Sequence, residues 1–284
     1  MIFALVTLYN PSQNVQYNIE KLAVQVDKVV LLDNSNDSNE ELFKKLINIQ
    51  YKPNYENLGL SIAFNKYLKN QNEIHDDDFV FFFDQDSIIP DCHIAKMIKE
   101  YERIQSQNIN IGILGPVYYN NSSGRIEESD NTEFVTDYSF YVDRVITSSM
   151  LCQFKTIKEV GFWNEEIFLD MADWDLCWRL LNYGKKCCMT TISVLQHQIG
   201  KKTKKIGPFR IIYDREIREY YQIRDGLKLL KKKYLPRRYV YYLIYMLTLR
   251  IILETIFFKK KRLRLRMYFK GILDYKNRIN GAYL

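Results

Sequence analysis

The chain has 284 residues, 47% of them hydrophobic, so it can bury a substantial core and is not a disordered polypeptide. Its five cysteines form no disulfide framework and no paired zinc motif, and Met1 leads straight into a strand-like run rather than a secretory signal, so we expect a reducing cytosol. The net charge of +7 is uneven, because residues 201–284 hold 24 Lys and Arg against 6 Asp and Glu, a net +18, which leaves −11 for residues 1–200. The acidic front part argues against nucleic-acid binding, whereas the basic tail suits anionic lipid or a lipid-linked phosphate.

The first part of the chain alternates predicted strands and helices. Apolar runs at 2–8, 28–32 and 79–83 predict strands, and helical spacing predicts helices at 15–26 and 40–49 and another that opens at 57–61. This alternation predicts an α/β fold with parallel strands and right-handed crossovers. The sequence has neither the Gly-rich fingerprint of dinucleotide folds nor a P-loop, so a nucleotide would be held by other means.

The run at 79–83 ends in two carboxylates, Asp84 and Asp86, with Gln85 between them. Five apolar residues without alternation predict a strand buried on both faces, and ligands of open α/β sheets bind at the carboxyl ends of such strands. Asp33 ends an earlier strand in the same way. Two carboxylates at that edge suit Mg²⁺ or Mn²⁺ shared with a diphosphate. A solvated acidic turn is the alternative interpretation.

Further polar candidates follow later elements. Gly59 allows close backbone approach at a helix N-terminus, which suits an anionic group. The pattern predicts a helix at 90–105, a strand at 111–117, an irregular hairpin region at 118–146, a strand at 146–154, a helix at 156–160 and a strand at 186–195. Asp173 begins a predicted helix, where it can also simply cap free N–H groups, and His197 follows the last strand as a metal or phosphate ligand or an ordinary polar residue.

In their order, these motifs resemble the inverting nucleotide-sugar glycosyltransferases of family 2, which have a GT-A fold, and among them the bacterial rhamnosyltransferases of surface polysaccharide. The likeness covers roughly residues 2–225. It is carried by Thr7-x-Tyr9-Asn10-Pro11, Asp33-Asn34-Ser35, Glu56-Asn57-Leu58-Gly59 with Ala63 and Asn65, Asp84-Gln85-Asp86-Ser87, Gly115-Pro116, the block from Gly161-Phe162 to Arg179, His197-x-x-Gly200 and Tyr220-Tyr221-x-x-Arg224.

The resemblance implies a role for each matching residue. Thr7, Tyr9 and Asp33 would hold the base and ribose, Asn57, Gly59 and Asn65 would line the nucleotide pocket, and Gln85 and Arg224 would contact the donor. Asp84, Asp86 and His197 would bind Mg²⁺ or Mn²⁺. Asp173 aligns with the general base, with Asp170 as a rival, and Trp174 and Asp175 would face the acceptor. The sequence departs from the family pattern at Ala172, where Glu is usual, and at Asp175, where the rhamnosyl branch has Glu.

The implied activity is inverting transfer of L-rhamnose from dTDP-β-L-rhamnose to a lipid-linked saccharide. Transfer of galactofuranose or another hexose from a UDP-sugar is the alternative within the fold. A catalytically silent subunit that keeps the fold for binding or assembly is the alternative from another class.

The tail divides the predicted chain into a catalytic domain, 1–205, and a basic helical region, 206–284, with helix expected over 208–236. Tyr239–Phe258 is mainly apolar, and basic residues crowd Lys259–Arg266. This combination predicts a helix in the interface of the cytoplasmic leaflet, hence peripheral attachment to the inner face of the cell membrane. A helical hairpin packed on the catalytic domain, a homodimer contact and a membrane span are the alternatives.

Overall fold

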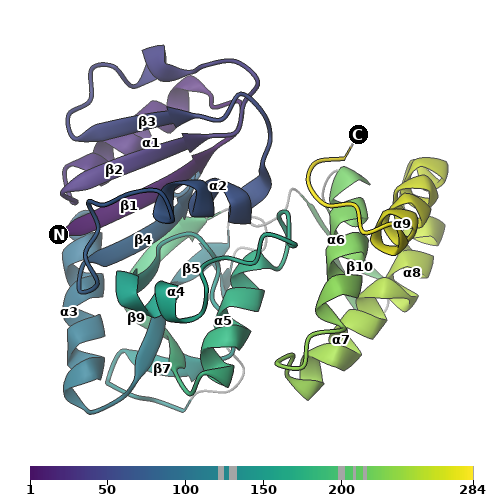
Figure 1. The fold of residues 1–284 in the computed structure, drawn as a ribbon. Coiled ribbons are helices and arrows are strands. Elements are labelled where there is room, and N and C mark those ends of the chain that lie inside the picture. Colours follow the sequence, from purple (N-terminus) through teal and green to yellow (C-terminus); the bar gives the residue numbers. More distant parts are fainter. Residues whose placement is uncertain (121–124, 128–132, 198–201, 207–208, 214–215, 284) are drawn as a thin grey trace.

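A mostly parallel sheet forms the centre of the computed structural model, which describes residues 1–120, 125–127, 133–197, 202–206, 209–213 and 216–283 (Figure 1). Within these residues the order of strands is β3 (Ile49–Pro53), β2 (Lys28–Asp33), β1 (Ile2–Leu8), β4 (Phe79–Asp84), β8 (Met150–Gln153), β5 (Ile111–Asn120), β9 (Lys186–His197) and β7 (Ser139–Val142), with β6 (Arg125–Glu127) paired to β5. Neighbours among β3, β2, β1 and β4 are parallel, as are β5 and β9, whereas β6, β7 and β8 run antiparallel to their partners. The predicted α/β class is confirmed.

Helices cover both faces of the sheet, and alternate strand residues belong to different buried clusters. Phe81 and Phe83 of β4 pack with α1 (Gln13–Ala23) and α3 (His93–Ser106). Phe82 packs with α2 (Gly59–Leu68), α4 (Phe154–Glu159) and α5 (Ala172–Asn182). The unbroken apolar run of β4 therefore reflects burial on both faces, as the sequence predicts.

Two predicted helices differ from the structure. Residues 40–49 were expected to form a helix, but only Glu40–Leu42 forms a short 3₁₀ turn (η1) before β3 begins at Ile49. Phe43 is the one buried side chain in this stretch, so a helix there would bury too little surface to repay its ordering. The helix expected from residue 208 begins only at Glu216, because Phe209–Tyr213 forms β11, which pairs with β10 (Lys202–Ile206).

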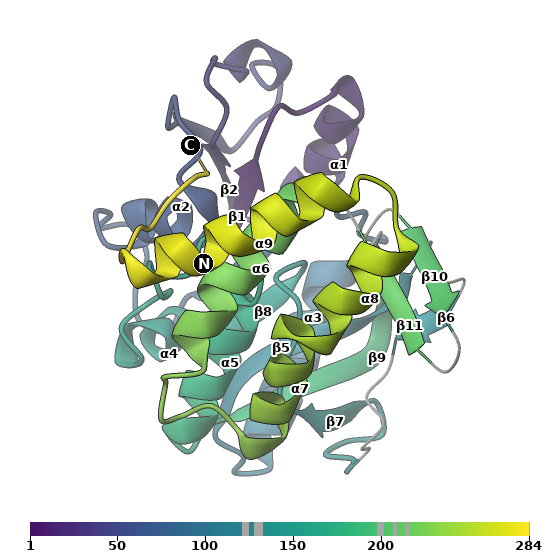
Figure 2. The ribbon, with the colours of Figure 1, turned by 90° about the vertical axis from the view of Figure 1, so that its right-hand side faces the viewer.

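The C-terminal helices pack against the central sheet and its helices. α6 (Glu216–Leu229) and α7 (Arg237–Leu247) lie beside α5, and α8 (Leu249–Phe257) and α9 (Lys261–Lys276) form an outer layer (Figure 2). Leu229, Leu235, Tyr239 and Leu243 are buried in the same cluster as α2 and α5. The predicted boundary at 205/206 falls inside the β10–β11 hairpin, and α6 and α7 share the core of the catalytic part.

Candidate active site

The carboxyl ends of β1 and β4 bring the first group of candidate residues together. The register pairs Thr7 with Asp84. Beyond the strands, the Tyr9 N–H donates to Oε1 of Gln85 at 2.8 Å, and the Gln85 amide donates back to the Tyr9 carbonyl at 3.3 Å. Asp86 is exposed, Asp84 is partly buried, and Tyr9 is half exposed. These side chains are therefore accessible at one edge of the sheet.

Thr147 and Ser148 connect Asp84 and Asp173, which are almost ninety residues apart in the sequence. The Ser148 hydroxyl donates to Oδ2 of Asp84 at 2.9 Å, and the Thr147 N–H donates to Oδ2 of Asp173 at 3.2 Å. The segment reaches both because it leads into β8, which pairs with β4. The strand predicted over 146–154 is wrong in its first part, because β8 begins only at Met150 and residues 147–149 form a turn before it. The only sequence signal of this bridge is the run of hydroxyl residues Thr147-Ser148-Ser149.

Asp173 lies in the first turn of α5, in surroundings that favour its neutral form. The pKa of its carboxyl is raised to about 7, mainly by burial and also by the negative charge of Asp84. The N–H groups of Trp174 and Thr147 and the charge of Arg144 act in the opposite direction. Oδ1 accepts from the Trp174 N–H at 2.9 Å, so Asp173 also holds one N–H of the first turn, as the capping interpretation proposed. A carboxyl with this pKa can take up and release a proton near neutral pH.

Asp170, the rival base, lies in a different environment. Both of its oxygens bind the Arg218 guanidinium of α6, Oδ2 at 3.3 Å from Nε. Its side chain is 10% exposed. Since its oxygens are occupied by an ion pair, the geometry favours Asp173 as the base.

An aromatic wall stands beside Asp173. The Arg144 guanidinium carbon lies 3.9 Å from the centroid of the Trp174 ring and within 6 Å of the rings of Tyr239 and Tyr242 on α7. Asp143, the neighbour of Arg144, pairs with Arg238 of the same helix. Trp174 is partly exposed, and Arg144 covers one face of its ring. Nothing in the sequence motifs had pointed to Arg144.

Three residues predicted to line the nucleotide pocket instead hold α2 in place. Gly59 has φ +75°, and a Cβ there would overlap the Phe168 carbonyl oxygen. The close approach it allows is thus to the chain itself, and the Leu60 N–H donates to that carbonyl at 2.7 Å. Asn57 accepts from the Gly59 N–H. Asn65, 1% exposed, bonds the backbone N–H and carbonyl of Trp163. The first two N–H groups of α2, those of Gly59 and Leu60, thus already have partners within the chain, and the anion site expected at this helix N-terminus stays a prediction.

Asp33 is also turned inward. It is 1% exposed, and its carboxylate accepts from the Ser35 N–H, the Asn39 amide and the Tyr51 hydroxyl. These bonds order the loop after β2, and the contact of Asp33 with base and ribose stays a prediction.

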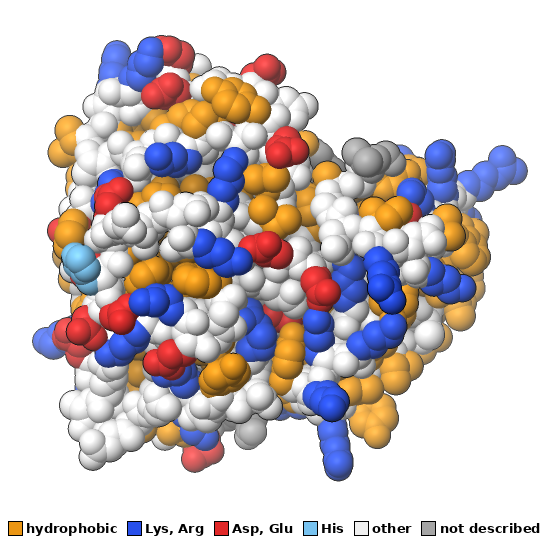
Figure 3. All heavy atoms as spheres, in the orientation of Figure 1, with side chains coloured by type: hydrophobic (Ala, Val, Ile, Leu, Met, Phe, Trp, Pro, Cys, Tyr) orange, Lys and Arg blue, Asp and Glu red, His pale blue; other side chains and the backbone are white. Residues whose placement is uncertain are grey.

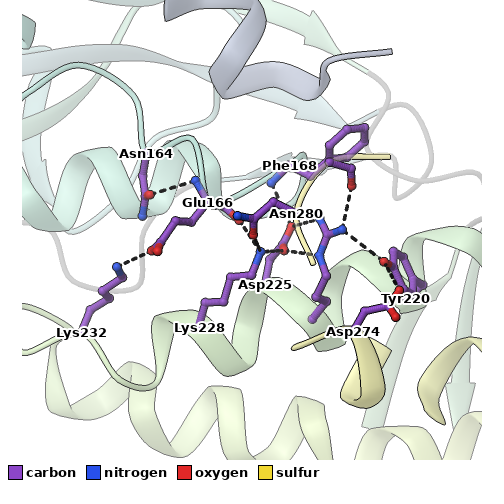
Figure 4. A network of polar contacts seen from close by, with 11 residues as sticks. Asn164, Glu166, Phe168, Tyr220, Asp225, Lys228, Lys232, Asp274 and Asn280 are labelled. Carbon is purple, nitrogen blue, oxygen red and sulfur yellow. Dashed lines mark hydrogen bonds and ion pairs between the residues drawn. The ribbon is translucent and has the colours of Figure 1, made fainter. Parts of the chain in front are cut away.

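Asp175 and Arg224 are buried in structural networks. Asp175 is fully buried and binds Arg179, Asn164 and Tyr234, and its contact with the acceptor stays a prediction. Arg224, also fully buried, binds Asp225, the Tyr220 hydroxyl and the Gly281 carbonyl, and its contact with the donor stays a prediction as well. Figure 4 shows the neighbouring network, in which Asp225 accepts from the Phe168 N–H and Lys228 reaches Glu166. A sequence pattern cannot distinguish a buried ion pair from a ligand contact.

The metal prediction rests on Asp84 and Asp86. The described part of the chain contains no cluster of three His, Cys, Asp or Glu arranged for a metal. The His197 backbone belongs to β9 opposite Asn120, and its side chain lies outside the described residues. Two carboxylates fit Mg²⁺ or Mn²⁺, because such ions bind one or two carboxylates and take further ligands from substrate phosphates.

Comparison with known proteins agrees with this geometry. Residues 4–157 match Glycosyl transferase family 2. The chain is 30% identical over 251 residues to a dTDP-rhamnosyl transferase, RfbF, of Shigella flexneri, covering 83% of this chain and 81% of that protein.

Two solved structures are similar in fold. GalNAc-T7, crystallised with UDP, GalNAc and Mn²⁺, superposes with a TM-score of 0.57 at 9% identity, and S. aureus TarS with 0.54 at 12%. Both alignments cover 98% of this chain but only 56% and 49% of those structures, so the chain spans about half their length. These likenesses confirm the GT-A fold. The family match and the 30% identity show that the chain belongs to glycosyl transferase family 2 and resembles its rhamnosyltransferases.

Proposed function

We propose that the protein transfers L-rhamnose from dTDP-β-L-rhamnose, with inversion, to a lipid-linked saccharide acceptor in bacterial cell-surface polysaccharide synthesis. The observation that carries the mechanism is the pairing of two carboxylates through consecutive residues, Asp84 on Ser148 and Asp173 on Thr147. The choice of donor is supported by the 30% identity to a dTDP-rhamnosyl transferase.

The two carboxylates have separate tasks in this proposal. The acceptor hydroxyl attacks the anomeric carbon of the sugar, the bond from that carbon to the diphosphate oxygen breaks, and Asp173 takes the hydroxyl proton. Attack opposite the leaving group inverts the anomeric centre without a covalent enzyme intermediate. Trp174, partly exposed and next to Asp173 in the chain, is the side chain that we expect to contact the acceptor sugar. Thr7, Tyr9 and Gln85 lie at the donor edge with Asp84.

Asp84 and Asp86 would hold a divalent cation, Mg²⁺ or Mn²⁺, which would neutralise charge on the leaving nucleoside diphosphate. Ser148 supports this role, because its hydroxyl fixes one oxygen of Asp84. We expect Asp86→Ala to remove the Mn²⁺-dependent part of dTDP affinity, measured by calorimetry with and without Mn²⁺. The exposed Asp37→Ala is the matched control. If Asp86→Ala leaves the Mn²⁺ effect intact, the cation is held elsewhere.

The donor is tested by supplying dTDP-rhamnose, UDP-galactofuranose, UDP-glucose and UDP-N-acetylglucosamine in turn, with Mg²⁺ or Mn²⁺, and measuring the shift in melting temperature and donor hydrolysis. Stabilisation and turnover by dTDP-rhamnose alone are expected. Preference for a UDP-sugar would replace the donor but keep the reaction. Tight binding of a donor without hydrolysis or transfer would favour a catalytically silent binding subunit.

A further inference from the structure

The outer helices α8 and α9 have an inverted arrangement of charged and apolar residues. In α8, Arg250 and Glu254 turn inward, with 2.6 Å between Nε and Oε1, while Ile252 and Ile256 are 56% and 53% exposed. In α9, Arg264 and Asp274 are buried and Phe269 and Leu273 are 62% and 52% exposed. Helices on the surface of a protein in water usually have the opposite arrangement.

The inward charges are satisfied within the protein. Arg264 lies between Glu219 of α6 and Glu254 of α8. Asp274 accepts from the Tyr220 hydroxyl of α6 at 2.7 Å and from Lys270 at 2.8 Å. These ion pairs fix which faces of α8 and α9 point inward, so the exposure of the apolar faces is a consequence of specific contacts rather than of loose packing.

The exposed apolar side chains lie on the outer side of both helices. Leu249, Ile252 and Ile256 follow at three- and four-residue spacing along one side of α8, and Leu265, Phe269 and Leu273 do so on α9. Figure 2 looks directly onto these two helices, and in Figure 3 hydrophobic and basic side chains gather at the edge of the molecule where they lie. We call these six side chains the outer apolar face.

The charge around this face is almost entirely positive. Residues 237–284 contain 12 Lys and Arg against 2 Asp and Glu, and the two acids, Glu254 and Asp274, are both 2% exposed. Lys259, Lys260, Lys261, Arg262 and Arg266 are exposed beside the apolar side chains. A second copy of the chain would bring the same positive charge against this one, whereas an anionic bilayer complements both the charge and the apolar area.

We propose that the outer apolar face of α8 and α9 is the site at which the protein docks on an anionic lipid bilayer, lying in the headgroup interface with its basic residues on the lipid phosphates. Docking here would bring the enzyme of the proposed function to a membrane-bound acceptor. The biological purpose of docking rests on that proposed function, whereas the binding to lipid does not. The acceptor side is connected to this surface by α7, which packs on Trp174 through Tyr239 and Tyr242 and continues into α8.

The structure favours docking on the membrane over crossing it. By length and composition, Arg237–Phe257 is long and apolar enough to span a bilayer. However, α7 buries Tyr239, Leu243 and Met246 against the protein, and the backbone breaks at Thr248, with φ −129° and ψ −86°. The remaining nine residues of α8 extend about 14 Å, roughly half of a hydrocarbon core of about 30 Å.

The test measures the fraction of full-length protein that floats with lipid vesicles. One set of vesicles is phosphatidylcholine alone, and in the other about one lipid in three is the anionic phosphatidylglycerol. We expect binding to the anionic vesicles that weakens with salt, and a loss of at least tenfold in Ile252→Asp. Ile47→Asp is the matched control, since Ile47 is an exposed isoleucine outside the C-terminal helices, 78% exposed against 56% for Ile252, and the binding of this variant should equal that of the native chain. Replacing Lys259, Lys261 and Arg262 together by Ser should lower partitioning roughly 100-fold, because each basic residue contributes about fivefold.

Phe269→Asp, on the other helix, repeats the test in case Ile252→Asp does not fold, and the melting temperature of each variant is measured. Unchanged vesicle binding in both variants would overturn the proposal, as would equal binding to neutral and anionic vesicles. A dimer in light scattering that Ile252→Asp dissociates, without vesicle binding by the native chain, would instead make this face a contact between copies. Donor hydrolysis without vesicles is measured in parallel, so that failure of docking and failure of the proposed reaction are separable.

Discussion

Asp173 is the residue whose surroundings the structure defines most sharply. Burial raises its pKa to about 7, and the neighbouring Asp84 contributes in the same direction. A base must be deprotonated to act, so kcat/KM should fall about tenfold per pH unit below pH 7, whereas an ordinary aspartate would stay active to about pH 4.

Replacement of this carboxylate gives the direct test. We expect Asp173→Asn to bind the donor normally and to lose transfer by a factor of about 10²–10⁴, the usual contribution of a general base. The measurements are donor affinity by calorimetry and transfer by product formation. Asp170→Asn, which removes the partner of Arg218, is the comparison. Near-normal transfer by Asp173→Asn together with a large loss in Asp170→Asn would exchange their roles.

At the scale of elements, α2 is fixed at its first residue. Gly59 has a positive φ and no room for a side chain, because a Cβ would overlap the Phe168 carbonyl and stand 2.7 Å from its ring. Gly184 has nearly the same φ, +76°, but nothing within 4 Å of a Cβ. We expect Gly184→Ala to cost about 1 kcal/mol from backbone strain alone, and Gly59→Ala about 2–5 kcal/mol because the overlap adds to it. Urea unfolding of both variants measures the difference, and equal costs would show that the contact with Phe168 yields easily.

The N-terminus of α3 is tied to the site segment by His93. This fully buried ring binds the Ser149 hydroxyl through Nε2 at 2.6 Å and the Ser193 hydroxyl of β9 through Nδ1 at 2.7 Å. Ser149 directly follows Ser148 and has φ +62°, a conformation that needs such support. His93 thereby positions the segment that holds Asp84 and Asp173.

Burial lowers the pKa of His93 from 6.5 to about 4, with the charge of Lys96 acting in the same direction. As the pH falls through 6.5, the unfolded chain binds a proton that the folded chain does not. The free energy of unfolding should therefore fall between pH 6.5 and pH 4, by about 3 kcal/mol from this group. His93→Gln should show a shallower pH dependence in urea unfolding over this window, and the same slope in both proteins would contradict this account.

At the scale of the whole molecule, the C-terminal helices belong to the catalytic core. Tyr239 and Leu243 of α7 are buried in the cluster that contains Trp178, and the Tyr239 ring lies 4.8 Å from that of Trp178. A chain that ends at Leu235 should therefore lose about 5 kcal/mol or more, and melt about 10 °C lower or more. Ile252→Asp is the control and should melt like the native chain, because Ile252 is exposed. An unchanged melting temperature on truncation would make the tail a separate unit, as the predicted boundary at 205/206 implied.

The sequence by itself determined the strand core and the residues at its tips. Apolar runs such as 79–83 are recognisable because burial on both faces of a strand leaves no polar positions, and the acids that follow must lie at the sheet edge. The family motifs identified Asp84, Asp86 and Asp173, which remain the candidates for cation and base.

Only the tertiary structure decided which polar residues face a substrate and which face each other. Asn65 and Arg224 match the family pattern as well as Asp173 does, yet each is buried and bonds a distant part of the chain, Asn65 the Trp163 carbonyl and Arg224 the Gly281 carbonyl. The same holds for the tail, whose composition suggested lipid binding. Only the structure shows that Arg264 and Glu254 pair inside the protein. It also shows that Ile252 and Phe269 point outward. The physical reason is that a side chain's role depends on its neighbours in space, and packing between helices and sheet brings those neighbours from remote positions in the sequence.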